Sequence, residues 1–305
     1  MPAQAALQPL WYVERLGGWP RWTGRGQRVA LIDTGITPAH PLLPRWADLR
    51  DDASTRHPRG SPVDVRGHGT ACAGIIAGRP HPELGRYSVA PEALLGVGRM
   101  ATQGGEVGMA SFDFLLMLGW AVHAWRARVV AFPYAYESIR VGARVDVDLY
   151  SWVARRLRRA DRCLLFAAAG NEAGPPGLPA ASPGVIGIGA YQAWPATPSR
   201  VVPICAYGGV QQPSPHTEFF LAPGHSMRTT EPAADMLEDF SGTSAACAFA
   251  AGIAALYLER FEKDRLRLGR GYHLGEVLSA MRRDAETLVH PCLPGRHWLG
   301  LRFPA

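Results

Sequence analysis

Three short glycine-containing segments place an aspartate, a histidine and a serine in that order along the 305-residue chain. Asp33 lies in the segment LIDTG, His68 in GHGT and Ser244 in SGTSA. An imidazole can take the proton from a serine hydroxyl, and a carboxylate can orient that imidazole and stabilise its positive charge. The three segments therefore predict a serine nucleophile, provided that the fold brings these side chains together.

A fourth segment supplies a hydrogen-bond donor for the negative charge that such a nucleophile creates. Asn171 follows a run of alanines in AAAGNE, and its side-chain amide can donate to an oxyanion. Ser244 opens an alanine-rich run that predicts a helix, so its backbone N–H stands at the positive end of the helix dipole. Gly242, just before it, lets a substrate backbone approach closely.

Each segment also has an alternative interpretation. Ser244 could serve only as the N-cap of its helix. His68 could be a buried structural residue or, together with Cys72, a metal ligand. The DTG at Asp33 matches the signature of aspartic peptidases, but their mechanism needs a second carboxylate, and the chain has no second DTG. The GxSxG elbow of α/β-hydrolases is absent, because Ala246 replaces its second glycine. The four segments together favour the nucleophile.

With these segments the chain resembles the subtilisin-like serine peptidases, the subtilases, from Trp11 to the C-terminus. Flanking words such as RVALI, VAP and LAPG add to the resemblance. It implies a serine endopeptidase that forms an acyl-enzyme, with Asp33, His68 and Ser244 as the catalytic triad and Asn171 in the oxyanion hole. It also implies an α/β, three-layer, subtilisin-like fold, in which a mainly parallel sheet has helices on both faces.

The resemblance further implies that a substrate peptide pairs with two strand edges. The implied substrate-binding residues are Gly104, Gly105 and Glu106 on one edge, Pro133, Tyr134 and Ala135 on the other, and Ala169, Gly170 and Gly177 around the pocket for the residue before the cut. The second edge departs from the family pattern Asn-x-Ser-x-Gly, and Pro133 has no N–H. We therefore expect restricted specificity for a protein or leader-peptide substrate. Glu106 and Glu172 would favour basic peptides.

No metal or cofactor is expected. Leu42 stands where the family pattern implies an aspartate ligand for calcium, and residues 78–85 offer only Glu83 as a carboxylate. Residues 1–10 alone precede the family-like region, so we expect no inhibitory propeptide and instead control by a regulatory protein partner or by strict substrate choice. The altered edge also motivates an alternative function, a catalytically silent subtilase-like module that binds peptides or proteins.

Short apolar runs alternate with helical patterns, and this alternation predicts the elements that must position the four residues. Strands are expected at residues 28–32, 94–100, 129–132 and 164–169, and helices at 68–77, 110–126, 149–162 and 244–261, before a closing helix and a final strand. Such alternation favours a mainly parallel sheet with function at the carboxyl ends of its strands, where Asp33 and Asn171 fall. No linker divides the chain, so residues 1–305 are expected to form a single peptidase domain with residues 1–10 as an extension.

Composition argues against nucleic-acid and membrane partners. The net charge is +6, but the densest basic run lies in the helix expected at 149–162, where Trp152 and other apolar residues predict a buried face that leaves the arginines solvated. We expect no apolar stretch to be long enough to span a membrane, and residues 1–10 do not have the pattern of a signal peptide. Five widely spaced cysteines, an odd number, favour free thiols. We therefore expect a cytoplasmic protein.

Overall fold

The computed structural model describes residues 10–37, 39–43, 49–50, 63–64, 66–100, 102–103, 106–107, 111–135, 143–160, 162–172, 174–194, 197–203, 218–232, 237–289 and 297–305. The helices are α1 (Trp11–Arg15), α2 (His68–Ala77), α3 (Ser111–Gly119), the π-helical η1 (Trp120–Ala124), α4 (Ala143–Arg159), α5 (Thr243–Leu268) and α6 (Leu274–Asp284). The strands are β1 (Arg28–Asp33), β2 (Leu49–Arg50), β3 (Leu94–Arg99), β4 (Thr102–Gln103), β5 (Glu106–Val107), β6 (Val129–Phe132), β7 (Leu164–Ala168), β8 (Ile186–Trp194), β9 (Thr197–Pro203), β10 (Glu218–Pro223), β11 (Met227–Thr229), β12 (Leu237–Phe240), β13 (Glu286–Val289) and β14 (His297–Gly300).

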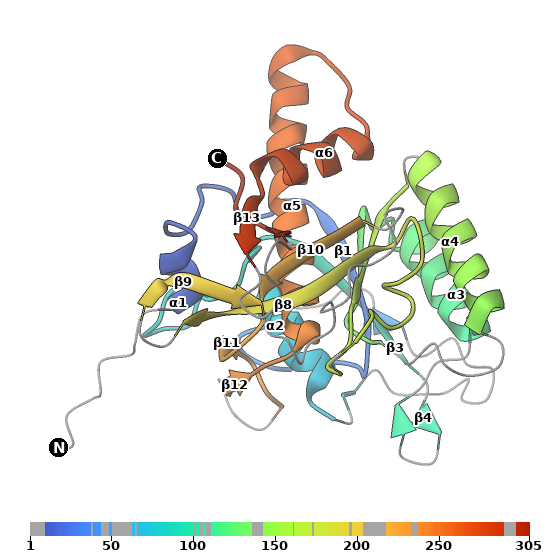
Figure 1. Cartoon of the computed structure of the whole chain (residues 1–305), viewed down its shortest axis with the longest axis horizontal. Helices are drawn as coiled ribbons and strands as arrows, with labels where there is room; N and C mark the ends of the chain where they lie inside the picture. The colour runs from blue at the N-terminus through green and yellow to red at the C-terminus, as the bar shows by residue number, and fades with distance from the viewer. Residues whose placement is uncertain are drawn as a thin grey trace.

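In the described part of the chain, ten strands form one sheet in the order β13-β14-β10-β8-β7-β6-β1-β3-β2, with β9 paired to β8 (Figure 1). The strands from β14 to β2 in this order pair in parallel, whereas β13 and β9 run antiparallel to their neighbours. The mainly parallel sheet expected from the sequence is therefore confirmed.

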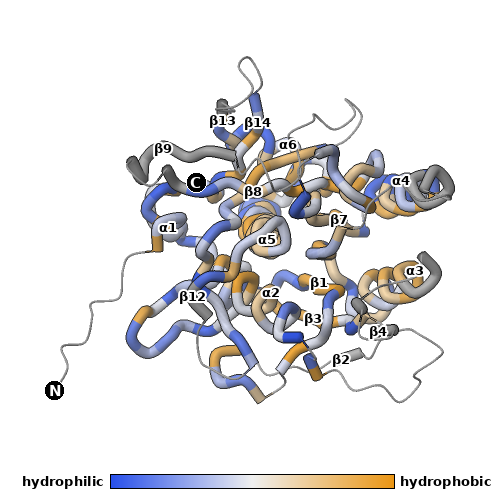
Figure 2. The backbone as a smooth tube through the Cα atoms, turned by 60° about the horizontal axis from the view of Figure 1, so that its bottom comes forward, coloured by the Kyte–Doolittle hydropathy of each residue, from blue (hydrophilic) through white to orange (hydrophobic). Residues whose placement is uncertain are grey.

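Alternate residues of the central strands face two different hydrophobic cores. In β1, Val29 and Leu31 pack with α2 and α5, whereas Ala30 and Ile32 pack on the other face with α3 and α4. Figure 2 shows the two groups of helices on opposite sides of β1 and β7. Both faces of a parallel sheet need such a cover, and the expected three-layer α/β architecture is the result.

Helix α5 runs through the middle of the larger core. From the sequence we expect no apolar stretch to be long enough to span a membrane. By length and composition alone, this helix is nevertheless long and apolar enough to cross one. However, 83% of its most apolar 18-residue window is buried inside the protein. All residues from 245 to 258 are buried, so α5 has the surroundings of a core helix.

The expected elements are present, but several differ in extent. Helix α4 (Ala143–Arg159) begins six residues before the helix expected at residues 149–162. The helix expected at residues 110–126 is found as α3 followed by the π-helical η1. Helix α5 continues seven residues beyond Phe261 to Leu268, where Gly269 adopts a left-handed conformation (φ 65°) and ends it. The chain closes with α6 and two antiparallel strands, β13 and β14, instead of one final strand.

The basic helix is present as α4, but its buried face differs from the expectation. Trp152 is 62% exposed, and the guanidinium carbon of Arg156 lies 5.7 Å from the centre of its ring. Tyr150 and Ala154, four residues apart, are buried instead, and Tyr150 stacks edge-on against Phe114 of α3. The prediction of a buried Trp152 is wrong, because the stripe that meets α3 lies further round the helix.

Candidate active site

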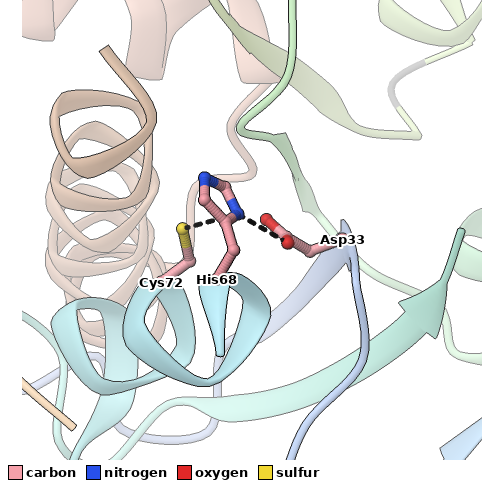
Figure 3. A group of neighbouring side chains, drawn as sticks. All are labelled: Asp33, His68 and Cys72. Carbon is pink, nitrogen blue, oxygen red and sulfur yellow. Dashed lines mark hydrogen bonds and ion pairs between the residues drawn. The ribbon is translucent and has the colours of Figure 1, made fainter. Parts of the chain in front are cut away.

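Asp33 and His68 meet where the carboxyl end of β1 faces the first turn of α2 (Figure 3). His68 Nδ1 lies 2.7 Å from Asp33 Oδ1, which also accepts the backbone N–H of Thr34 at 2.6 Å. Asp33 is fully buried, whereas the His68 side chain is 32% exposed. An ionised carboxylate only accepts hydrogen bonds, so Nδ1 carries the proton and Nε2 of the neutral ring is free to accept another.

Asp64, which the motifs did not single out, holds this pair in place. Its carboxylate accepts hydrogen bonds from the hydroxyls of Thr34 and Thr70 and from the backbone N–H groups of Arg66, Gly67 and Thr70, all at 2.7–2.9 Å. These five bonds join the loop after β1 to the first turn of α2. The signal in the sequence was the position of Asp64, four residues before His68 in the segment DVRGH.

The charges around His68 favour its protonated form. Burial by itself lowers the pKa of His68, but the charge of Asp33, its hydrogen bond and the charge of Asp64 outweigh burial and raise that pKa above the ordinary value of 6.5. For Asp64, burial acts in the opposite direction and raises the pKa, but the donated hydrogen bonds lower it below the usual range. Asp64 is therefore a carboxylate near His68 that stays ionised at neutral pH.

Ser244 is the second residue of α5, and its hydroxyl points to the end of β6. Ser244 Oγ donates a hydrogen bond of 2.8 Å to the carbonyl oxygen of Pro133. Ser244 and His68 are both described, and no hydrogen bond joins the serine hydroxyl to the imidazole. Ser244 and His68 nevertheless line one cleft, which has a volume of about 280 Å³. Transfer of the serine proton to His68 would require a rotation of the serine side chain.

Asn171 lies beside Ser244, and its side chain has a fixed orientation. Asn171 Oδ1 accepts hydrogen bonds from the backbone N–H and the hydroxyl of Thr243, at 3.0 and 3.1 Å. The oxygen is thus occupied, which leaves the amide Nδ2 as the group available to a ligand in the cleft. Gly242 has φ +135°, and a Cβ there would lie 3.2 Å from Asn171 Nδ2, so a side chain at this position would crowd the amide.

The predicted substrate-binding residues fall into three groups. Pro133, Tyr134, Ala135 and Gly170 line the cleft with Ser244, as expected. Ala169 and Gly177 are not among the described residues that line the cleft; the Gly177 N–H donates a hydrogen bond of 2.8 Å to the Ala169 carbonyl, and Ala168 lines the cleft. Gly104 and Gly105 lie outside the described residues, and so does the side chain of Glu106.

Besides Thr243, which precedes Ser244, three further residues that had not been predicted as site residues line the cleft, namely Thr34, Arg66 and Met100. Thr34 was visible only as part of the Asp33 segment, and Arg66 as a residue between Asp64 and His68. Met100 directly follows β3. Their common feature is a position just beyond a strand or just before a helix, where a parallel sheet gathers its functional residues.

The structure places Asp33 next to His68 and Cys72, the two metal ligands that the sequence had offered. Cys72 Sγ lies 3.9 Å from His68 Nδ1, and the ligand atoms of the three residues lie within 4.8 Å of one another (Figure 3). Burial and the charge of Asp33 raise the pKa of the Cys72 thiol, so its protonated form is favoured. A metal would have to displace this proton and the Nδ1–H donated to Asp33. The histidine–aspartate hydrogen bond and a metal at this place therefore exclude each other.

The remaining cysteines agree with the expectation of free thiols as far as they are described. Cys72, Cys163 and Cys247 are buried and unpaired. Burial raises the pKa of Cys163 to about 12 and that of Cys247 further still, which keeps both thiols protonated. Cys205 and Cys292 lie outside the described residues.

Comparison with known proteins connects this site to one family. Residues 24–276 match the family model described as the subtilase family, Peptidase_S8. Serine protease AprX of Bacillus subtilis is 30% identical over 269 residues, which cover 78% of this chain and 58% of that protein. An intracellular serine protease of Paenibacillus polymyxa is 28% identical over 260 residues, which cover 81% of this chain and 72% of that protein.

The matched proteins differ in how much of their length this chain spans. It spans 16% of one curated relative, Mycosin-1, 24% of another, Mycosin-3, and 58% of AprX. Among solved structures, a cold adapted subtilisin-like serine proteinase matches with a TM-score of 0.71 over 97% of this chain and 98% of that chain, at 18% identity. That likeness concerns the fold, whereas the family match covers most of the sequence. The chain belongs to the subtilase family.

Proposed function

We propose that this protein is a serine endopeptidase that hydrolyses peptide bonds through Asp33, His68 and Ser244. The observation that carries the proposal is the Asp33–His68 hydrogen bond of 2.7 Å, whose histidine lines the same cleft as Ser244 and Asn171. The relatives named as serine proteases support the same reaction. The reaction needs no metal or cofactor, because the imidazole supplies and removes the proton.

In the proposed first half-reaction, the Ser244 hydroxyl rotates from the Pro133 carbonyl to His68 Nε2. Its oxygen attacks the carbonyl carbon of the substrate while His68 takes the proton, and Asp33 stabilises the imidazolium. The negative charge on the substrate oxygen is held by Asn171 Nδ2 and by the Ser244 N–H in the first turn of α5, where backbone amides have no helical partner. His68 then protonates the leaving amine, and an ester of Ser244 remains.

In the second half-reaction, His68 takes a proton from a water molecule that attacks this ester, and then returns a proton to Ser244 Oγ. The acid is released and the free hydroxyl is restored. The two half-reactions use the same donors for the oxyanion, which is why one cleft suffices for both.

The cleft supports a restricted choice of substrate. Pro133 offers a carbonyl but no N–H, and Tyr134 narrows the edge beside it. We propose a protein or leader-peptide substrate bound in an extended conformation, with its residue before the cut between residues 133–135 and 168–170. We also propose a cytoplasmic location, which the intracellular relative supports, and control by a regulatory protein partner. Nucleic acid and membrane are not proposed as partners.

Active-site labelling tests the proposal directly. We expect a fluorophosphonate probe to label the wild-type protein on Ser244, and Ser244→Ala to abolish both labelling and peptide cleavage. Ser241→Ala is the matched control, because Ser241 lies three residues away and bonds to the Ser226 backbone outside the cleft. Failure of the folded wild type to react with the probe would contradict the proposal.

One observation favours the second candidate function, a catalytically silent peptide-binding module. The Ser244 hydroxyl is bonded to Pro133 and not to His68. A silent module would keep its partner affinity in Ser244→Ala and would never release a cleaved partner. Fragments that appear in a lysate with the wild type but not with Ser244→Ala would exclude it.

A further inference from the structure

Arg66 brings a positive charge into the cleft that the catalytic reaction does not require. It lines the cleft together with His68 and Ser244, and it is solvent-exposed. Its position is well defined by the backbone, because the Arg66 N–H donates to Asp64 Oδ1 at 2.9 Å and the next N–H donates to the same atom at 2.8 Å. The guanidinium therefore extends from an anchored backbone only two residues before His68.

No carboxylate of the described chain neutralises this guanidinium. Asp64 is the nearest acidic residue in sequence, but both of its oxygens are already occupied by hydroxyls and backbone N–H groups. Other exposed arginines of the protein do have partners, as Arg25 has in Glu92 and Arg265 in Glu262. Within the described part of the chain, Arg66 thus has no carboxylate partner, and its five N–H donors are available to a ligand.

The described lining of the cleft has no acidic side chain to oppose Arg66. Besides Arg66 and His68 it consists of neutral residues, namely Thr34, Met100, Pro133, Tyr134, Ala135, Ala168, Gly170, Asn171, Thr243 and Ser244. Glu172, from which a preference for basic peptides was expected, is exposed and is not among the described residues that line the cleft. Among the described residues that line the cleft, the fixed charge beside the nucleophile is therefore positive.

From these observations we infer that Arg66 selects substrates with an aspartate or glutamate next to the residue that occupies the pocket before the cut. The inference rests on the proposed endopeptidase function. Among the cleft residues, Thr34 follows β1, and Arg66 and His68 lie just before and at the start of α2, whereas the proposed pocket lies at the ends of β6 and β7, by residues 133–135 and 168–170. The selected side chain is consequently that of a neighbour, one position from the pocket residue.

The chemistry of the guanidinium explains why acidic substrate residues are favoured and basic ones disfavoured. A carboxylate can accept two parallel N–H bonds from the planar guanidinium, and each charged bond is stronger than a neutral one. A lysine or arginine at the same substrate position would be repelled by the positive charge of Arg66. Because substrate binding displaces water from the cleft, this repulsion selects against basic residues at this position. Because the pair stays partly exposed, we expect a moderate factor, about 5–10-fold in kcat/KM between glutamate and lysine.

A cleavage profile with the full-length protein tests the inference. A random peptide library is digested by the wild type, Arg66→Glu, Arg66→Gln and Ser244→Ala, and the cut sites are read by mass spectrometry. For the wild type, we expect Asp and Glu to be enriched next to the pocket residue. For Arg66→Gln, we expect no enrichment of acidic or basic residues at this position. For Arg66→Glu, we expect Lys and Arg to be enriched there. Arg79→Glu is the matched control, because Arg79 is exposed outside the cleft and its substitution changes the net charge by the same amount.

Kinetics on two peptides that differ only in Glu or Lys at that position give the size of the effect. The wild-type preference should shrink as the salt concentration rises, since mobile ions screen exposed charges. Cleavage that depends on Ser244 but shows no acidic enrichment, or an enrichment that survives Arg66→Glu, overturns the inference and leaves the endopeptidase standing. Enrichment of Lys or Arg by the wild type overturns it too. An absence of cleavage that depends on Ser244 overturns both proposals.

Discussion

The hydrogen bond between Asp33 and His68 determines at which pH the proposed base is available. Asp33 is fully buried, so its charge acts on His68 Nδ1 over 2.7 Å with little screening by solvent. The Asp64 carboxylate adds a second negative charge nearby. Two carboxylates thus stabilise the imidazolium, which helps the proposed transition state and also delays deprotonation of the free enzyme.

We therefore predict that kcat/KM falls on acidification with a midpoint above pH 6.5, the ordinary pKa of histidine. The sign follows because only neutral His68 accepts the Ser244 proton, and a raised pKa keeps it protonated up to a higher pH. The measurement is a pH profile of kcat/KM with a peptide substrate.

The same profile for Asp64→Asn provides the comparison. Removal of this charge should move the midpoint to lower pH, since the Asp64 charge raises the pKa of His68. A wild-type midpoint at or below 6.5, or no shift in the variant, would contradict the account.

At the scale of elements, close contacts at two glycines determine how α2 packs against its neighbours. A Cβ on Gly69 would lie 2.1 Å from the carbonyl oxygen of Gly35, and a Cβ on Gly74 would lie 2.3 Å from the hydroxyls of Thr229 and Thr230. These hydroxyls donate to the carbonyls of Ala71 and Thr70 in α2, at 2.6 and 2.8 Å. Helix α2 is therefore held between the loop after β1 and the strand β11.

We predict that Gly69→Ala displaces α2 from the β1 loop and destabilises the protein by about 1–3 kcal/mol, the range for overpacking a tight contact. Loss of the His68–Asp33 geometry should also lower kcat far more than KM. Chemical denaturation and steady-state kinetics measure the two effects.

Gly275→Ala is the control for this substitution. Gly275 lies in the first turns of α6, and a Cβ there meets nothing within 4 Å. The control should be neutral or stabilising by up to about 1 kcal/mol, because alanine favours a helix over glycine. Equal effects of the two substitutions would show that the contact with Gly35 does not matter.

At the scale of the whole molecule, α5 connects segments from both ends of the described chain. Glu259 on α5 is buried, and its Oε2 accepts the backbone N–H groups of Thr23, Gly24 and Arg25 at 2.8–3.2 Å. Trp22, next to them, donates its ring N–H to the carbonyl of Ala305. The loop before β1, the core helix and the last residues thus share one network, and we propose that the described residues unfold as one domain.

We predict one cooperative thermal transition, and a loss of at least about 2 kcal/mol in the free energy of unfolding for Glu259→Leu. The leucine fills the space but leaves three N–H groups without an acceptor. Glu262→Leu on the same helix is the control, since Glu262 forms a surface ion pair with Arg265, and the loss of this pair should cost less than about 1 kcal/mol. Two separate transitions, or equal effects of the two variants, would contradict the proposal.

The sequence by itself determined the family, the α/β class and the positions of Asp33, His68, Asn171 and Ser244, because each lies in a short motif next to a periodic apolar segment. Local pattern also sufficed for α2 and β6, whose bounds are those expected. Such features depend on neighbours within a few residues, and those neighbours can be read from the chain.

Only the tertiary structure decided which partners the polar side chains choose. Asp64 binds Thr34, thirty residues away, and Ser244 binds Pro133, 111 residues away. The exposure of Trp152 and the position of Arg66 in the cleft likewise follow from packing between distant elements. Hydrogen-bond partners and burial are set by contacts across the sheet and its helix layers, and no local pattern in a single sequence contains them.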